Sequence, residues 1–210
     1  MPPSHLRLYV DTQFASPYAM SAFVALTEKG LNVELTTVNL AEKENQSADF
    51  AAKSLTRRVP TLQHGEFFLS ESSAIAEYID ECFPGTALYP TEPRLKARAR
   101  QVQAWLRSDF MPIRQERTTE VVFYGTKGGA LSADARHAAA TLCSAVDALL
   151  TPGAAYACGQ WSIADVDLAI MLKRLALDEG VLPDRLADYA SRQWARPSVQ
   201  QWVHQDRPPL

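Results

Sequence analysis

A serine lies where the chain is expected to turn from a strand into a helix. The segment Ser16-Pro17-Tyr18-Ala19 follows a short strand-forming run and precedes apolar residues at helical spacing. The N-terminus of a helix presents unpaired N–H groups and a partial positive charge, so it stabilises an anion such as a thiolate. Taken alone, Ser16 is better explained as an ordinary N-cap followed by proline in the first helical position.

Two other segments could bind a ligand. Val59-Pro60 precedes a predicted strand, and a proline there favours a fixed peptide, trans or cis, that leaves the Val59 carbonyl and N–H free. The segment Ser70-Glu71-Ser72-Ser73 opens a predicted helix and gathers hydroxyls, a carboxylate and unpaired N–H groups at one point. The alternative explanation for the segment at Ser70 is simply a well-capped helix.

Candidates for a second pocket lie on or just after a long helix expected over residues 94–122. They combine apolar, cationic and aromatic side chains: Met111, Ile113, Arg114, Arg117 and Tyr124. The alternative is that the apolar members are core residues and the arginines are solvated.

The elements that position these residues differ between the two halves of the chain. Strands are expected over 6–10, 33–38, 61–63 and 67–69, and helices after Ser16, over 48–55 and after Ser70. This order, βαβαββα, is the thioredoxin-like α/β plan, with a parallel first pair of strands and a hairpin that turns at Gly65.

The rest of the chain shows only helical patterns. Helices are expected over 94–122, 132–150, 163–178, 184–193 and 197–205, and Ser162 with Asp165 forms a capping box. The predicted organisation is an α/β domain over 1–84, a linker rich in proline over 85–93, and an all-helical domain over 94–210.

Composition and charge limit the classes of partner and of site that the protein is expected to have. The 210 residues are 47% hydrophobic, enough for two modest cores, and the net charge of −3 gives no reason to expect a nucleic acid or an anionic membrane as partner. Three cysteines and four histidines are scattered without ligand spacing, so a metal site has little support. No segment is typical of a signal peptide or a membrane span, and we expect the protein in the cytoplasm.

Taken together, the motifs resemble those of the cytosolic glutathione transferase family. The matching segments are Ser16-Pro17-Tyr18-Ala19, Arg58-Val59-Pro60-Thr61-Leu62, the run from Ser70 to Tyr78, and Ser162-Ile163-Ala164-Asp165. The resemblance implies a two-domain fold, glutathione as co-substrate without a metal, and a homodimer.

The resemblance also implies roles for individual residues. Ser16 stands where the family keeps the group that stabilises the glutathione thiolate. Val59 would pair its backbone with the cysteinyl unit, and Pro60 would be the cis proline. Glu71 and Ser72 would bind the γ-glutamyl ammonium and carboxylate, as charge complementarity also favours.

The implied activity is attack of the thiolate on a small electrophile or on an organic hydroperoxide. A serine at position 16 cannot form a mixed disulfide, which disfavours a glutathione-dependent thiol reductase. Ser54-Leu55-Thr56-Arg57 replaces the Asn-Pro-x-Gly that often precedes Val-Pro in the family. A non-catalytic assembly or regulatory subunit with the same fold is the alternative from another class.

Overall fold

The structure, a computed structural model that describes residues 5–176 and 181–210, divides into two compact units. Unit 1 comprises Met1–Leu88 with Gln201–Leu210, and unit 2 comprises Tyr89–Gln200. The predicted helical domain runs over 94–210, and the structure groups the residues from 201 onward with unit 1. The physical reason is Trp202, a fully buried side chain that packs against Phe14 and Phe23.

Unit 1 contains the thioredoxin-like sheet that the sequence predicts. Its order is β2 (Glu34–Val38), β1 (Leu6–Asp11), β3 (Thr61–His64) and β4 (Phe67–Ser70). The strands β1 and β2 are parallel, and the other two pairs are antiparallel. Gly65 has a φ of 61° in the turn between β3 and β4, a backbone angle that glycine adopts without steric cost.

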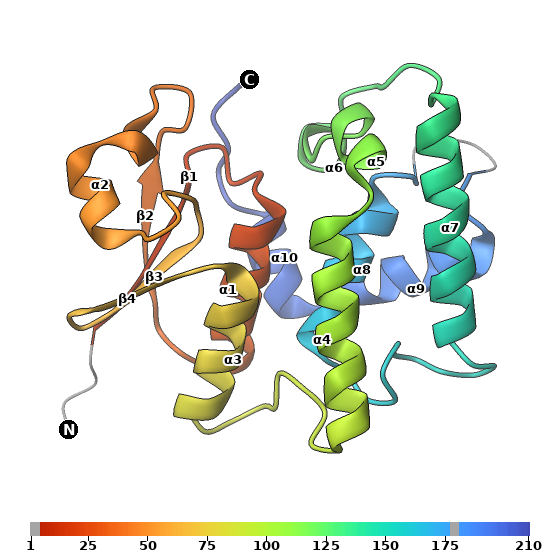
Figure 1. The fold of residues 1–210 in the computed structure, drawn as a ribbon, viewed down its shortest axis with the longest axis horizontal. Helices are drawn as coiled ribbons and strands as arrows, with labels where there is room; N and C mark the ends of the chain where they lie inside the picture. The colour runs from red at the N-terminus through yellow and green to blue at the C-terminus, as the bar shows by residue number, and fades with distance from the viewer. Residues whose placement is uncertain (1–4, 177–180) are drawn as a thin grey trace. The chain divides into compact units, whose positions relative to one another are not determined.

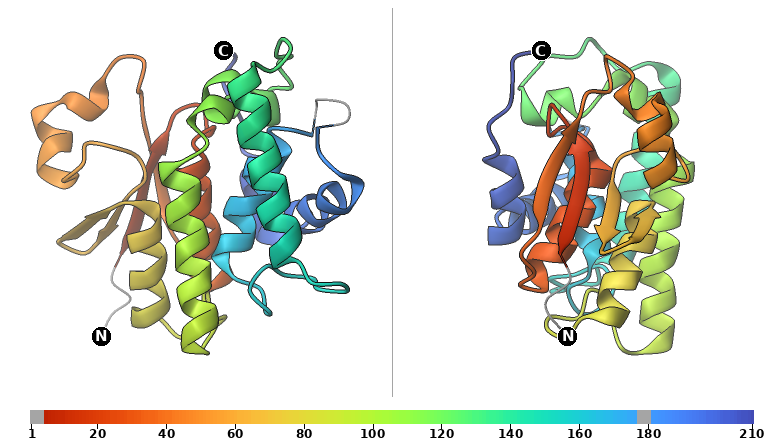
Figure 2. Two further views of the ribbon diagram at one scale, coloured as in Figure 1. Left: turned by 45° about the vertical axis from the view of Figure 1, so that its right-hand side comes forward. Right: turned by 90° about the vertical axis from the view of Figure 1, so that its left-hand side faces the viewer.

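Both faces of the sheet are covered by helices (Figure 1, Figure 2). On one face α1 (Pro17–Glu28) packs against α3 (Ser72–Cys82), and an ion pair of 2.8 Å joins Lys29 to Asp80. On the other face, after the 3-10 helix η1 (Glu44–Gln46), α2 (Ala48–Lys53) brings Phe50 into a buried cluster with Tyr9, Val38 and Val59. Strand β1 is therefore apolar on both sides.

Unit 2 is all helical and contains more breaks than the sequence predicts. Its helices are α4 (Pro93–Ser108), α5 (Met111–Glu116), α6 (Glu120–Phe123), α7 (Ala133–Leu149), α8 (Ile163–Lys173), α9 (Asp184–Trp194) and the start of α10 (Pro197–Val203). The single helix expected over 94–122 is wrong, because Phe110 adopts a left-handed φ of 61° that ends the α-helical path. Helix α8 ends at Lys173, and part of its expected extension to residue 178 lies outside the described residues.

Helix α8 forms the core of unit 2 and is buried from Ile163 to Leu172. Asp165 lies in its first turn and accepts the Ser162 N–H at 2.9 Å, which confirms the predicted capping box. The same carboxylate accepts the Ala157 N–H at 2.8 Å and the Tyr189 hydroxyl at 2.6 Å. One buried acid thus fastens the start of α8 to α9 and to the preceding loop. Across the described ranges, no helix is long and apolar enough to cross a membrane.

Candidate functional site

Ser16 is the N-cap of α1, so its hydroxyl lies at the positive end of a helix. Its Oγ accepts the Ala19 N–H at 3.2 Å, and Pro17 follows in the first turn of the helix. Because the oxygen is the acceptor in this bond, the hydroxyl proton remains to be donated to a ligand. The half-buried side chain therefore acts as a cap and can also donate to an anion at the positive end of the helix.

Asp11, which is not among the predicted site residues, positions Ser16. This carboxylate, only 4% exposed, ends β1 and accepts the N–H groups of Ala15 at 2.7 Å and Ser16 at 3.1 Å. Burial raises the pKa of Asp11, and the two backbone hydrogen bonds oppose that effect. An aspartate just before a loop, five residues ahead of an N-cap, was the signal available in the sequence, since such residues bond to nearby backbone N–H groups.

The Val59–Pro60 peptide bond is cis, one of the two geometries that the sequence allows and the one that the resemblance implies. The Val59 side chain is buried in the cluster beneath α2, and Pro60 leads directly into β3. Among residues 5–176 and 181–210, the backbone N–H and carbonyl of Val59 have no hydrogen-bond partner. A peptide-like ligand that pairs with both groups would satisfy them.

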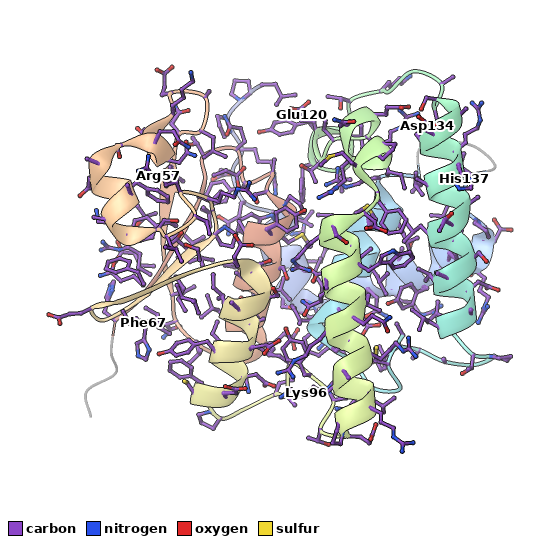
Figure 3. The ribbon with its side chains drawn as sticks, viewed as in Figure 1. Arg57, Phe67, Lys96, Glu120, Asp134 and His137 are labelled. Atoms are coloured by element: carbon purple, nitrogen blue, oxygen red, sulfur yellow. The ribbon has the colours of Figure 1, made fainter. Side chains whose placement is uncertain are left out.

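The loop before this peptide is fixed by hydroxyl groups. Thr61 Oγ1 donates to Ser54 Oγ at 2.9 Å, and Ser54 Oγ lies 2.9 Å from Ser70 Oγ. These three buried side chains tie the end of α2 to β3 and β4. Leu55 is 96% exposed in this loop, and Arg57 has a φ of 52°. Figure 3 labels the Arg57 side chain.

Glu71 begins α3 with a strained backbone. Its φ of 73° and ψ of 115° lie outside the regions that residues with a β-carbon readily adopt, which costs about 1 to 3 kcal/mol. Its side chain is exposed and, within the described chain, makes no capping hydrogen bond, while the neighbouring Ser72 is buried. Strain of this kind persists where the surroundings enforce it, and it is often found at ligand-binding positions.

The sheet register brings these segments to one end of the sheet. Tyr9 of β1 pairs with Thr61 of β3, and Thr61 pairs with Ser70 of β4. The loop to Ser16 leaves β1 just beyond Tyr9, the cis peptide precedes Thr61, and the start of α3 follows Ser70. Segments more than 50 residues apart in sequence therefore emerge together, and they offer a hydroxyl donor, a free peptide unit and a carboxylate beside a helix N-terminus.

The residues predicted for a second pocket lie in unit 2 and differ in exposure. Met111 at the start of α5 is 50% exposed, whereas Ile113 in the same helix is fully buried. Arg114 and Tyr124 are half-buried, with Tyr124 at the end of α6.

Arg117 is the one buried cation among these candidates, since it is only 2% exposed and its guanidinium contacts backbone carbonyls. Its Nη1 donates to the Glu116 carbonyl at 2.9 Å and its Nη2 donates to the Gly129 carbonyl. A β-carbon at Gly128 would collide with the guanidinium, and Arg174 donates in turn to the Arg117 carbonyl. Arg117 therefore fixes the loop between α6 and α7, and its role in a second pocket stays a prediction.

Two sequence profiles divide the chain at the same place as the fold. The profile of the glutathione S-transferase N-terminal domain matches residues 8–81, and that of the C-terminal domain matches residues 92–206. The chain belongs to the glutathione S-transferase family. Glutathione is the co-substrate of this family, and the described residues contain no group of three or more His, Cys, Asp and Glu side chains that could bind a metal ion.

Individual members of the glutathione S-transferase family match in sequence and in structure. Maleylacetoacetate isomerase of Pseudomonas aeruginosa is 34% identical over 112 residues, 51% of each chain, and human glutathione S-transferase theta-2 is 30% identical over 102 residues, 48% of this chain and 41% of the relative. The chain thus spans about half the length of these curated relatives. The crystal structure of a glutathione transferase homologue from Burkholderia strain BGR1, with bound glutathione, superposes with a TM-score of 0.77 at 46% identity, covering 94% of this chain and 95% of the other.

Proposed function

We propose that this member of the family is a glutathione transferase in which Ser16 activates the thiol of glutathione. The observation that carries the proposal is the meeting of the Ser16 loop, the Val59–Pro60 peptide and the start of α3 at one end of the sheet. The Burkholderia homologue, similar over almost the whole chain, binds glutathione, which supports the same ligand here.

Glutathione would lie along these three segments, with each part matched by its chemistry. The Val59 backbone pairs with the cysteinyl unit beside cis Pro60, as an added strand pairs with a sheet edge. The Glu71 carboxylate binds the γ-glutamyl ammonium, and the Ser72 hydroxyl with the first turn of α3 binds its carboxylate.

Thiol activation follows from the position of the sulfur. A thiol of this type has an unperturbed pKa of about 8.5, so most of it is protonated at neutral pH. Ser16 donates a hydrogen bond to the sulfur, and the N-terminus of α1 adds its partial positive charge. Each unit by which the pKa falls corresponds to about 1.4 kcal/mol of preferential thiolate stabilisation.

The thiolate then reacts with a small electrophile or with an organic hydroperoxide. In conjugation it forms a carbon–sulfur bond and expels the leaving group. With a hydroperoxide it attacks oxygen and, with one proton, releases the alcohol; a second glutathione converts the resulting sulfenic acid to a disulfide and water. Met111, Arg114, Arg117 and Tyr124 are the proposed residues for this second substrate, with the exposed Met111 the best supported.

Isomerisation is a second candidate. Relatives from Ralstonia and Pseudomonas aeruginosa, 33% and 34% identical over about half their lengths, are named maleylpyruvate isomerase and maleylacetoacetate isomerase. Reversible addition of the same thiolate to a conjugated cis double bond would allow rotation and release of the trans product, with glutathione regenerated.

The finer assignments belong to the same proposal. The segments 16–26 and 70–79 resemble the enterobacterial glutathione transferase YfcF, and we place the protein near that branch of the family. A cytoplasmic location is supported by three free cysteines, which suit a reducing compartment. A homodimer is the proposed assembly.

Turnover measurements with and without the Ser16 hydroxyl test the proposal. We expect wild-type protein to conjugate an aryl halide or reduce an organic hydroperoxide with glutathione, and Ser16→Ala to lose about 10- to 100-fold in kcat, as the loss of a hydrogen bond to a charged group implies. Binding of glutathione without turnover of an aryl halide, a hydroperoxide or a cis-diacid would instead favour the non-catalytic subunit.

A further inference from the structure

The last ten residues, 201–210, form a C-terminal tail that packs against the loop leading to Ser16. The Trp202 side chain is completely buried, and its ring centroid lies 5.5 Å from that of Phe14 and 5.4 Å from that of Phe23. Arg207 Nη2 donates a hydrogen bond of 3.1 Å to the Phe14 carbonyl. Both an apolar and a cationic side chain of the tail therefore contact this loop.

The Arg207 guanidinium is itself fixed by the end of α10. Its nitrogen atoms donate to the carbonyls of Trp202 at 2.9 Å, Val203 at 2.6 Å and Gln205 at 3.1 Å. Trp202 and Val203 are the last two residues of α10 and Gln205 lies just beyond it, so the guanidinium is at a helix C-terminus, where a cation is favourable. Because the planar guanidinium has several donors in fixed directions, it connects the helix end to the Phe14 carbonyl in one geometry.

The loop that receives this contact adopts an unfavourable conformation. Phe14 has a φ of 48°, a left-handed angle that is uncommon for a bulky residue and that persists only when neighbours enforce it. On one side the Phe14 N–H donates to the Asp11 carbonyl at 3.0 Å, and on the other its carbonyl accepts from Arg207. The residues directly after Phe14 are Ala15 and Ser16, whose N–H groups bind the Asp11 carboxylate.

Arg207 also acts on Asp11 through charge. Burial raises the pKa of the Asp11 carboxyl, backbone hydrogen bonds lower it, and the positive charge of Arg207 lowers it further. Arg207 therefore favours the ionised carboxylate that binds the N–H of Ser16.

We propose that the C-terminal tail positions the Ser16 hydroxyl, with Arg207 as a positioning residue that acts through Phe14 and Asp11. The inference rests on the proposed function of Ser16. Without the Arg207 contact the loop relaxes from its strained conformation, and the hydroxyl spends less time aimed at the sulfur. The thiol becomes harder to ionise, while the γ-glutamyl part, bound at Glu71 and Ser72, keeps its contacts.

The test is Arg207→Ala, with Arg7→Ala as a matched control. Arg7 is an arginine of the same unit that pairs at 2.9 Å with Glu34 on a neighbouring strand and, among the residues that the structure describes, makes no hydrogen bond or ion pair with the loop over residues 12–16. The thiolate absorbance of bound glutathione, followed against pH, gives the pKa of the thiol. Calorimetry with S-methylglutathione, which has no ionisable thiol, gives the affinity for the rest of the molecule.

In Arg207→Ala we expect the pKa of the bound thiol to rise by about 0.5 to 1 unit, with a three- to tenfold loss of kcat/KM near neutral pH and a Kd for S-methylglutathione within about twofold of wild type. Arg7→Ala should change none of these. Arg207→Lys keeps the positive charge but lacks the planar guanidinium, so the pKa of the bound thiol should lie between those of the wild type and Arg207→Ala. In a Ser16→Ala background, Arg207→Ala should add no further shift, because both residues act through one hydroxyl.

An unchanged thiol pKa in Arg207→Ala would overturn the inference, as would a full additional shift in the Ser16→Ala background. If Arg207→Ala fails to fold, Arg207→Lys decides by the same measurements, since a wild-type pKa in that variant contradicts a geometric role. A wild-type protein that does not lower the thiol pKa at all would contradict the proposed function itself, which is a separate result.

Discussion

Glu71 combines a carboxylate that we propose binds glutathione with a strained backbone, and two substitutions separate the two properties. We expect the free energy of unfolding of Glu71→Gly to be about 1 kcal/mol higher than that of Glu71→Ala, because glycine tolerates the φ of 73° and alanine does not. Both variants should lose glutathione affinity, because both lack the carboxylate. Denaturant unfolding gives the first quantity and calorimetry the second; equal stabilities would show that the position is not strained.

The buried Cys158 thiol should make the free energy of unfolding fall at alkaline pH. Burial, helped by the negative charge of Asp165, raises the pKa of this thiol from its ordinary value of 9.0 to about 11. Because the pKa is higher in the folded state than in the unfolded state, the protonated Cys158 thiol contributes to stability. This contribution is fully present below pH 9 and is lost as the pH rises toward 11. After allowance for solvent screening, we expect the free energy of unfolding to fall by about 1 to 2 kcal/mol across that window.

Cys158→Ala serves as the control for this pH dependence. The variant should be less stable at neutral pH, because a buried side chain is truncated, but its stability should fall less steeply between pH 9 and 11. Parallel pH profiles for the two proteins would rule out Cys158 as the source. Tyr189 is present in both proteins, and burial, the main cause that raises its pKa, is common to the two profiles.

At the scale of elements, the start of α8 depends on one carboxylate. Asp165→Ala leaves the Ala157 N–H, the Ser162 N–H and the Tyr189 hydroxyl without their acceptor in a buried site. We expect a loss of at least about 3 kcal/mol in the free energy of unfolding. Asp134 is an exposed acid in the first turn of α7 and is labelled in Figure 3. The control variant Asp134→Ala should lower the free energy of unfolding by less than about 1 kcal/mol. Similar losses in both variants would contradict the assigned role.

The elements of unit 1 could be predicted because their signals are local. Alternation in β1, the turn at Gly65 and the cap at Ser16 each lie within a few residues, and together they gave the element order and the segments of the candidate site. The break after α4 has one local signal, Pro112 in the first turn of α5, because a proline inside a helical pattern ends or kinks the helix. Phe110 adopts a left-handed angle without the glycine that usually marks one, and the apolar spacing continues across the break.

The contacts that complete the site were missed for a different reason. Asp11 accepts hydrogen bonds from backbone groups four and five residues later, and nothing in the sequence distinguishes it from the aspartates that make no such bonds. Arg207 contacts the Phe14 carbonyl across 193 positions, a contact that depends on the whole fold and leaves no periodic pattern. Local patterns thus point to the Ser16 hydroxyl as a candidate but not to Asp11 and Arg207, whose hydrogen bonds to its loop depend on the fold.

For the whole molecule, the proposed homodimer is the first property to measure. The family resemblance supplies this expectation, and the segments 73–79 and 98–105 offer mixed apolar and charged faces suited to a two-fold contact. Light scattering at micromolar concentration should give twice the mass of the chain. Because folding and assembly are linked, the melting temperature should rise with protein concentration, whereas a monomer with full turnover would contradict the proposal.

The most direct measurement of the central claim is the pKa of the glutathione thiol bound to the wild-type protein and to Ser16→Ala. The thiolate absorbance, followed from acid to alkaline pH at saturating glutathione, reports this value. We predict a pKa at least about one unit below the free value of about 8.5 in the wild type, and a rise of at least about one unit on loss of the hydroxyl. A bound thiol that titrates like free glutathione, or the same pKa in both proteins, would contradict the account.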